Sequence, residues 1–529
     1  MEGRIELPQI RLTPQDLTRN IDEAESALLA TDIELYQMKG TLVHTVRLDH
    51  QQLDGDAQVH RESGALNIRE AKSGRLLEFF LSAAKFYRFD KRQGAWVPTI
   101  PSALFLNTYI ARGEWSLRVL TGIIEAPTLR PDGSVLFESG YDPATGIYLD
   151  TGGIEFPEIP EQPDRDAALT ALALLKDIIK DFPFVPDHDA DQPGAPCAAR
   201  SVALSAMLTG VVRKALRTAP AHAVDATSMA TGKTLLCDVI AMLATGRAAA
   251  SISQGQTREE FNKRLFSVLL QGDPVVVIDN IDQEVSSDEF CTILTAPEWQ
   301  NRVLGESETR KVPTNALFLP NGNNIRFKGD MITRVIACRM DARVENPGAR
   351  RFDRDLRVYV PENRPQLVVA ALTVLRAFIV AGRPGAASLE PFARFEDWSN
   401  LVRGALVWLG EPDPLATRAA VVAIDPETEN LSGLIAALKR VIGLDRWVTA
   451  KDILDAADIT KDFDDDSKAT SARMELDDAV RAIFPRFAPT PMALGKYLVA
   501  FDGRIVDGLC IRKHAVKGKS TKFALVAEP

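Results

Sequence analysis

The residues with the clearest chemical potential lie in Thr227–Thr234, a segment that reads TSMATGKT. Its surroundings predict a short apolar strand before it and an amphipathic helix after it, capped by Gly246. Such a loop surrounds phosphate oxygens with backbone N–H groups and a helix N-terminus, while its lysine neutralises the terminal phosphates and its last threonine coordinates Mg²⁺. We therefore expect ATP and Mg²⁺ at Thr227, Ser228, Met229, Ala230, Thr231, Gly232, Lys233 and Thr234.

Thr227 departs from the usual phosphate-loop pattern, which has its first glycine at this position. Gly-Lys-Thr alone is a common sequence, so the prediction depends on the flanking strand and helix and on a second motif. Pro274–Ile281, PVVVIDNI, predicts a buried strand with Asp279 near its C-terminal end. Because the carboxyl ends of parallel strands meet at one edge of a sheet, Asp279 is expected beside the loop, holding Mg²⁺ through water.

The catalytic base is left open by Asn280, which stands where most ATPases of this type have glutamate. Asp282 or Glu284 could supply a base, or Asn280 could orient the attacking water without accepting its proton.

A third strand, Asn315–Pro320, runs into an Asn-Gly-Asn-Asn sequence. An amide at the tip of this strand can sense the γ-phosphate and position water, and Asn323 is the first choice, with Asn324 second. The alternative is an ordinary turn.

An arginine that reaches a neighbouring subunit's ATP can stabilise transition-state charge. Arg334, in GDMITRVIACRMD, is expected on a short helix before another strand and is assigned this finger role. Arg339 and Arg343 are weaker alternatives for this role. The alternative without a catalytic role is that Arg334 is a surface arginine in a salt bridge.

Trp299–Pro313 predicts a β-hairpin that turns at Gly305. Its cations Arg302, Arg310 and Lys311 are candidates for gripping DNA phosphates, and the alternative is an ordinary exposed hairpin.

Together these motifs resemble the AAA+ ATPases of phage and mobile-element replicative helicases, the superfamily 3-like and MCM-like group that includes primase/helicase proteins. The resemblance rests on MATGKT, VVVIDN, NGNN and GDMITR, and the flanks Thr121–Asp150 and Phe392–Pro414 look similar too. It implies a hexameric ring, ATP sites between subunits and DNA in the central pore. Thr227 and Asn280 put the hydrolysis rate in doubt, though not the binding site.

The expected fold class is α/β, an AAA+ P-loop ATPase core between a mixed, β-rich N-terminal domain and a C-terminal helical plus winged-helix region. Alternating residues predict strands at Thr41–Leu48 and Leu76–Tyr87, and turn residues predict a late hairpin at Arg504–Ile511 and Lys522–Val526. The predicted domains are a mixed α/β N-terminal domain (1–165), a helical lead-in (166–218), the ATPase core (219–360), a helical region (361–431) and a winged-helix-like DNA-binding domain (432–529).

The 529 residues carry a formal net charge of −10, which counts mildly against nucleic-acid binding and demands a local basic surface. The C-terminus offers one, with His514–Lys522 as the expected wing. A solvated charged hairpin is the alternative. The candidate DNA contacts there are Arg512, Lys513, Lys517 and Lys519.

The five cysteines lack zinc-ligand spacing and are expected to be reduced thiols of a cytosolic protein. No signal peptide is predicted, and the apolar stretch Leu367–Val380 is judged too short to span a bilayer, so the protein is expected to be cytoplasmic, without a membrane partner. Asp54, Asp56 and His60 lie in a polar loop and give little support to a primase site, so any priming is assigned to a separate protein.

Three functions remain open at this point. The first is a translocating DNA helicase of a prophage or mobile element. The second is an AAA+ switch, such as a replication initiator or loader, whose slow hydrolysis would suit Asn280. The third is a DNA-independent ATPase, which would explain the acidic charge balance. Stimulation of hydrolysis by single-stranded DNA separates the third from the first two.

Overall fold

The computed structural model describes residues 7–49, 52–54, 59–187, 196–302, 309–344, 346–419, 426–458, 467–484, 488–506, 508–514 and 520–527. The chain divides into two compact units. The first comprises Met1–Ile325 and Thr333–Arg418, and the second comprises Arg326–Ile332 and Ala419–Pro529.

A seven-stranded sheet forms the centre of the first unit, in the order β20-β14-β19-β16-β15-β5-β4. The first five strands are parallel, and β5 joins β15 in antiparallel orientation. This confirms the expected α/β class with a parallel core. The strands are β14 (Ala221–Ala226), β15 (Ala250–Ser253), β16 (Val275–Ile281), β19 (Leu317–Asn323), β20 (Val335–Met340), β5 (Val59–Arg61) and β4 (Gln52–Asp54).

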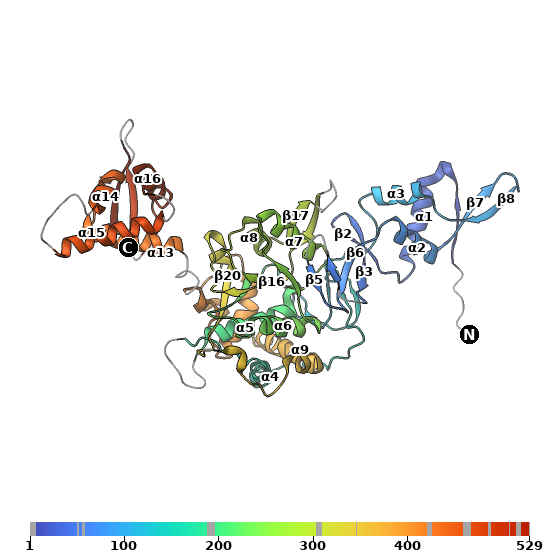
Figure 1. Cartoon of the computed structure of the whole chain (residues 1–529). Coiled ribbons are helices and arrows are strands. Elements are labelled where there is room, and N and C mark those ends of the chain that lie inside the picture. The colour runs from blue at the N-terminus through green and yellow to red at the C-terminus, as the bar shows by residue number, and fades with distance from the viewer. Residues whose placement is uncertain are drawn as a thin grey trace. The chain divides into compact units, whose positions relative to one another are not determined.

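Helices cover both faces of this sheet, which is why its central strands are continuous apolar runs. Figure 1 shows α5, α6 and α9 on one side of the strands and α7 and α8 on the other. The helices are α4 (Arg165–Ile178), α5 (Ala198–Val212), α6 (Lys233–Thr245), α7 (Arg258–Leu270), α8 (Asp288–Thr295) and α9 (Leu356–Val380).

Helix α9 extends well beyond the apolar stretch Leu367–Val380, because it begins at Leu356, where the Asp355 carboxylate accepts a hydrogen bond from the Arg357 N–H (2.9 Å). Among the residues that the structure describes, α9 is the one helix long and apolar enough to cross a membrane by length and composition. Most of its apolar residues, including Leu372 and Phe378, are buried, and it packs on α4 and α6. This packing accounts for its hydropathy.

The N-terminal part contains two small sheets, β2-β3-β6 and β1-β7-β8. The strand expected at Thr41–Leu48 is confirmed as β3, but the strand expected at Leu76–Tyr87 is wrong. Leu76, Phe80 and Ala83 are buried at helical spacing in α2, and a strand starts only at Lys85. The elements are β1 (Gln9–Leu12), α1 (Leu17–Leu29), β2 (Leu35–Met38), β3 (Thr41–Arg47), β6 (Leu66–Glu70), α2 (Ser73–Ala83), β7 (Lys85–Asp90), β8 (Ala95–Thr99) and α3 (Ala103–Ala111).

Short strands follow before α4, and short helical turns follow α9. They are β9 (Gly122–Ile124), β10 (Thr128–Leu129), β11 (Val135–Leu136), β12 (Gly140–Asp142), β13 (Ile147–Leu149), α10 (Glu396–Trp398) and α11 (Gly404–Trp408). A hairpin of β17 (Glu298–Arg302) and β18 (Thr309–Pro313) lies between α8 and β19 in the chain.

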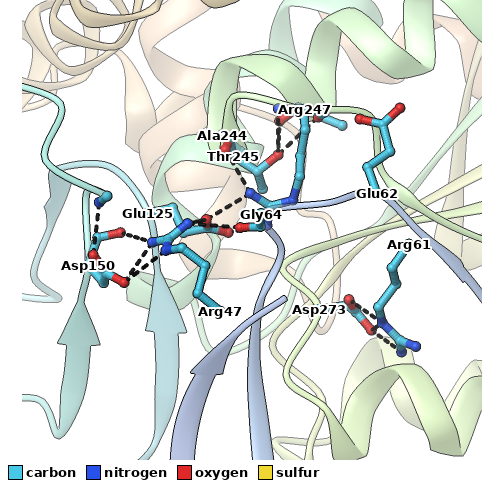
Figure 2. Close-up of polar contacts among 12 residues, drawn as sticks. Arg47, Arg61, Glu62, Gly64, Glu125, Asp150, Ala244, Thr245, Arg247 and Asp273 are labelled. Atoms are coloured by element: carbon cyan, nitrogen blue, oxygen red, sulfur yellow. Dashed lines mark hydrogen bonds and ion pairs between the residues drawn. The ribbon is translucent and has the colours of Figure 1, made fainter. Parts of the chain in front are cut away.

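Buried ion pairs fasten the N-terminal strands to the central sheet (Figure 2). Arg61 on β5 donates to Asp273 through Nε (3.0 Å) and Nη2 (2.6 Å), and both side chains are almost fully buried. Glu125, also buried, accepts hydrogen bonds from Arg47 of β3 and from Arg247, which follows α6 (both 2.8 Å). Strands β3 and β5 are therefore joined to the region of the parallel sheet by polar contacts, whereas the sheet β1-β7-β8 packs on a separate apolar core with α1, α2 and α3.

The described residues of the second unit form four α-helices and a four-stranded antiparallel sheet, β21-β24-β23-β22, around an apolar core of their own. Arg504–Ile511, expected as one strand of a hairpin, itself contains the short hairpin of β22 and β23, with Gly508 at φ +72°. The elements are α13 (Pro426–Val441), β21 (Val448–Thr449), α14 (Ala450–Ala457), α15 (Ser467–Ile483), α16 (Pro491–Ala500), β22 (Ile505–Val506), β23 (Leu509–His514) and β24 (Lys522–Ala527).

Candidate nucleotide site

The predicted phosphate loop connects the end of β14 at Ala226 to the start of α6 at Lys233. Gly232 has φ +103°, a backbone conformation that favours glycine, and a Cβ there would lie 3.3 Å from the Phe182 ring, which would have to shift slightly. Apart from the turn at Met229–Ala230, no backbone hydrogen bond from the N–H groups of residues 228–232 is seen within the described part of the chain. These groups and the first turn of α6 offer the donors that a phosphate would need.

The structure explains why Thr227 can replace the first glycine of the pattern. Its φ is not in the left-handed region, unlike that of Ala230 (φ +57°). Its backbone N–H donates to the Met340 carbonyl (3.4 Å), which continues the pairing of β14 with β20, and its hydroxyl donates to Asp341 Oδ1 (3.2 Å). Thr227 therefore anchors the loop to the neighbouring strand.

Lys233 lies at the centre of the site. Its Nζ donates to Asn323 Oδ1 (2.6 Å) and to the Ser228 carbonyl (3.2 Å). Burial lowers the pKa of Lys233, and the nearby carboxylates Asp225 and Asp279 oppose that shift. The structure thus brings Asn323, the first choice for the sensing amide, against the loop lysine.

Asn321, which the sequence analysis did not choose, connects the two predicted metal ligands. Its Nδ2 donates to Asp279 Oδ1 (2.6 Å) and contacts Thr234 Oγ1 (3.4 Å). Asn321 is 2% exposed, and its Oδ1 has no hydrogen-bond partner among the described residues. Strand alternation was the available signal, because Asn321 and Asn323 lie two apart on β19 and so share a face.

The arrangement of Thr234 and Asp279 fits Mg²⁺. This ion binds few protein groups directly and takes its other oxygens from water and phosphates. A hydroxyl and a carboxylate joined by one amide suit that pattern, and among the described residues no cluster of three or more His, Cys, Asp or Glu side chains could hold a metal alone. Thr234 would coordinate the ion and Asp279 would hold it through water.

Asn280 occupies a bulge in β16, where the register with β19 shifts between Ile278 and Ile281. Its φ is +51°, a left-handed conformation that asparagine adopts more readily than glutamate. This gives a local backbone reason for the residue that replaces the usual glutamate. The alternative bases Asp282 and Glu284 are exposed.

A second carboxylate that the sequence analysis missed, Asp225, lies at the end of β14. It accepts a hydrogen bond from the Ile325 N–H (2.9 Å) and pairs with Arg339 (3.3 Å). Burial raises its pKa. Asn324, the second-choice amide, accepts from Arg339 (3.3 Å), so it faces this pair and Asn323 faces Lys233.

Arg334 ends a short 3-10 helix, Gly329–Arg334, directly before β20, as expected. Its side chain is buried in the single chain (4% exposed), and Nη1 donates to Thr333 Oγ1 (3.1 Å). A finger must leave its own subunit, so this role requires Arg334 to move out of the position described. Arg343 is exposed, with φ +49°.

The hairpin expected at Trp299–Pro313 is confirmed as β17 and β18, while its turn at Gly305 lies outside the described residues. Arg302 and Lys311 share its exposed face. Arg310 points to the other face and pairs with Glu70 of β6 (2.9 Å, 11% exposed). Arg302 and Lys311 are therefore better placed than Arg310 for the predicted phosphate contacts.

In the second unit, Arg512 and Lys513 are exposed on β23, and Lys513 pairs with Asp502 (3.2 Å). Lys517 and Lys519, the other predicted DNA contacts, lie outside the described residues, as does most of the expected wing.

A cavity of about 340 Å³ opens beside the phosphate loop. Phe182, Leu235 and Phe352 give it apolar walls, and Arg357 lies at its edge in an ion pair with Asp238 of α6 (2.7 Å). A mostly apolar cavity with a few polar groups suits a flat heterocycle next to charged phosphates.

No protein-family model matches the chain, and no curated protein matches it. Among solved structures, the apo C-terminal region of NrS-1 is similar at 12% identity and a TM-score of 0.36, covering 86% of this chain and 99% of that one. The SCCmec type IV Cch helicase is similar at 12% identity and a TM-score of 0.35, covering 94% and 97%. The JCV helicase is similar at 14% identity and a TM-score of 0.20, covering 47% and 74%. At these values, the function of the chain has to be argued from its own geometry.

Proposed function

We propose that the chain is an ATP-dependent DNA helicase or translocase with an AAA+ P-loop core, of the kind found in prophages and mobile elements. The observation that carries the proposal is the convergence of Lys233, Asn323, Asn321, Asp279 and Thr234 at the carboxyl edge of a parallel sheet. These groups come from two neighbouring strands, β16 and β19, and from the start of α6, as a site for a phosphate chain and Mg²⁺ requires.

Each residue has a definite role in this proposal. Lys233 would leave Asn323 to neutralise the β- and γ-phosphates of bound ATP, and Thr234, with Asp279 acting through water, would hold Mg²⁺, whose chemistry is to offset negative charge on the phosphates. Asn321 keeps the two metal ligands in register, and Asn323 is freed to contact the γ-phosphate or the attacking water. The cavity lined by Phe182, Leu235 and Phe352 receives the base.

The coupling to DNA is proposed on the charges that the chain presents outside this site. Arg302 and Lys311 lie together on the exposed face of a hairpin, and Arg512 and Lys513 lie on β23 of a helix-and-hairpin unit that suits a winged helix. We further propose assembly into a ring, as a hexamer, with Arg334 acting on the ATP of the adjacent subunit. Primers would come from a separate protein.

The first test is the ATPase rate of the full chain with and without single-stranded DNA, beside Lys233→Ala. Stimulation that the variant loses supports a DNA-coupled motor, and strand displacement on a forked duplex then tests unwinding. Wild-type turnover by Lys233→Ala would remove the whole site assignment.

A mixing experiment tests the ring. Lys233→Ala and Arg334→Ala chains should each be inactive, but in a mixed ring an intact loop can face an intact arginine, so mixing should restore part of the activity. No recovery in rings shown to be mixed would contradict a role for Arg334 across an interface.

A second candidate function is a non-translocating ATP switch, a replication initiator or loader. It is favoured by Asn280, because this residue cannot act as a general base and the acids nearby in sequence are exposed. Slow hydrolysis that single-stranded DNA stimulates without strand displacement would support the switch. A flat response to DNA would instead support the third possibility, a DNA-independent ATPase.

A further inference from the structure

The three-stranded sheet β1-β7-β8 buries one face and leaves the other in solvent. Ile10 and Phe86, which are register partners, point into the core shared with α1, α2 and α3 and are 3% and 2% exposed. Side chains alternate across a strand, so Arg11 and Tyr87, the next register pair, lie on the opposite face. Phe89 and Trp96, which pair between β7 and β8, share that outer face with Tyr87.

This outer face carries aromatic rings that the domain core does not use. Phe89 is 50% exposed and meets Trp96 edge to face, with ring centroids 5.6 Å apart. The Arg11 guanidinium lies over Trp96, 5.3 Å from the ring centroid. Accessible rings beside a planar cation are the groups on which unpaired bases stack.

The same strands and their turn are strongly basic in a chain whose net charge is −10. Gln9–Leu12 and Lys85–Thr99 contain a single acidic residue, Asp90, whose Oδ1 closes the turn by accepting from the N–H groups of Arg92 (2.8 Å) and Gln93 (3.3 Å). Five cations of these segments are exposed. Arg11 and Lys85 share the outer face with Tyr87, Lys91 and Arg92 lie in the turn, and Arg88 lies on the side of Phe86. The face thus combines positive charge with stacking surfaces.

We propose that this aromatic sheet face, defined by Arg11, Lys85, Tyr87, Phe89 and Trp96, binds single-stranded DNA. Bases stack on Phe89 and Trp96, and phosphates contact Lys85 and the cations of the turn. Figure 1 shows β7 and β8 extending beyond α1 and α2, which leaves this hairpin open to a single strand of DNA. This binding of DNA does not require ATP at the phosphate loop. Only the choice of DNA over RNA as the ligand rests on the proposed function.

Photocrosslinking tests where DNA lies. The full chain with Lys233→Ala is irradiated with an oligothymidine that contains 5-iododeoxyuridine, and the crosslinked peptides are identified by mass spectrometry. We expect crosslinks within residues 85–99, at Phe89, Trp96 or Tyr87. Crosslinks that fall only elsewhere in the chain would overturn the proposal.

Affinity measurements test how the face binds. In anisotropy titrations of a short oligothymidine, Phe89→Ala with Trp96→Ala should weaken binding about 5- to 150-fold for each base that loses its stacking partner. Phe89→Tyr with Trp96→Phe keeps both rings and should retain binding. The matched control is Phe137→Ala, an exposed phenylalanine elsewhere in the chain (36% exposed), which should change nothing.

Charge variants provide a readout that loss of folding would not mimic. Lys91→Ala with Arg92→Ala, at the exposed turn, should reduce the slope of log affinity against log salt by about 0.7 for each lost phosphate contact. An unchanged slope would contradict phosphate binding by the turn.

Three further outcomes would also overturn the proposal. They are tighter binding of oligouridine RNA, equal binding of blunt duplex DNA, and loss of self-association without loss of DNA affinity in the double alanine variant. The last would make the face an interface between copies of the chain. If DNA does not stimulate ATP hydrolysis but crosslinks still fall in residues 85–99, the proposed DNA-coupled motor would be refuted. The proposal that the aromatic sheet face binds DNA would still hold.

Discussion

Replacing Asn321 by alanine removes the amide that joins Thr234 and Asp279, the two proposed metal ligands. In the structure its Nδ2 donates a short hydrogen bond to the Asp279 carboxylate (2.6 Å) and a long, weaker one to Thr234 Oγ1 (3.4 Å). We expect ATP to bind still, because Lys233 and the loop N–H groups remain. Turnover should fall, because Asp279 is no longer held where the Mg²⁺ shell requires it.

The size of the effect follows from the hydrogen bond to Asp279 that the substitution removes. A hydrogen bond to a charged group contributes about 1.5–3 kcal/mol, and the weaker interaction with Thr234 adds little. If this energy is expressed mainly in the transition state, kcat should drop roughly 10- to 150-fold, since each 1.36 kcal/mol is a factor of ten.

The assay is steady-state ATP hydrolysis alongside equilibrium binding of a fluorescent ATP analogue, with thermal unfolding to detect any loss of stability at this buried position. Asn324→Ala is the matched control, because that amide faces Arg339 and should have a much smaller effect. Turnover by Asn321→Ala within twofold of wild type, with Mg²⁺ dependence unchanged, would refute the reasoning.

Three other substitutions test the loop and the core. Gly232→Ala places a Cβ at φ +103°, a strain of about 1–2 kcal/mol that should weaken nucleotide affinity roughly tenfold, whereas Gly433→Ala, with open space around it, should not. Asp273→Asn leaves the guanidinium of Arg61 buried without its carboxylate and should lower the free energy of unfolding by about 3–5 kcal/mol in urea titrations. Burial lowers the pKa of His222 to about 3, so below its unfolded value of 6.5 only the unfolded chain gains a proton. Between pH 6.5 and about 3, the free energy of unfolding should therefore fall by about 1.4 kcal/mol for each unit by which the pH is lowered. The His222→Gln variant should show a flatter dependence on pH, and parallel profiles for the two proteins would contradict the reasoning.

Much of the central fold was predictable because its signals are local. The loop between β14 and α6, the buried run ending in Asp279 and the hairpin around β17 and β18 each carry their own turn chemistry and apolar spacing. Leu76–Tyr87 was mistaken for a strand although its buried residues Leu76, Phe79, Phe80 and Ala83 follow the helical pattern i, i+3, i+4 and i+7, and the strand begins only at Lys85.

The site was harder to predict where it depends on register between strands. Asn323 was selected from the turn, but Asn321 could be recognised only once β19 was known to lie beside β16, which brings its amide to Asp279. The roles of Thr227 and Asn280 depend equally on partners distant in sequence, a β14–β20 contact and a bulge in β16. The sequence pattern alone showed that Thr227 and Asn280 differ from the residues usual at these positions. It could not show the backbone contacts and the φ angle that account for the difference.

The antiparallel strand β5 closes an edge that the parallel sheet would otherwise leave open at β15. An uncovered edge presents unpaired N–H and C=O groups and promotes pairing between molecules. A shortened chain that starts near residue 165 would keep the whole predicted phosphate loop. It would, however, expose the edge of β15 and leave the buried Asp273 carboxylate without its partner Arg61. We therefore expect the N-terminal segment to keep the proposed ATPase core soluble, and a shortened version should retain β4 and β5 or cover the edge of β15 in another way.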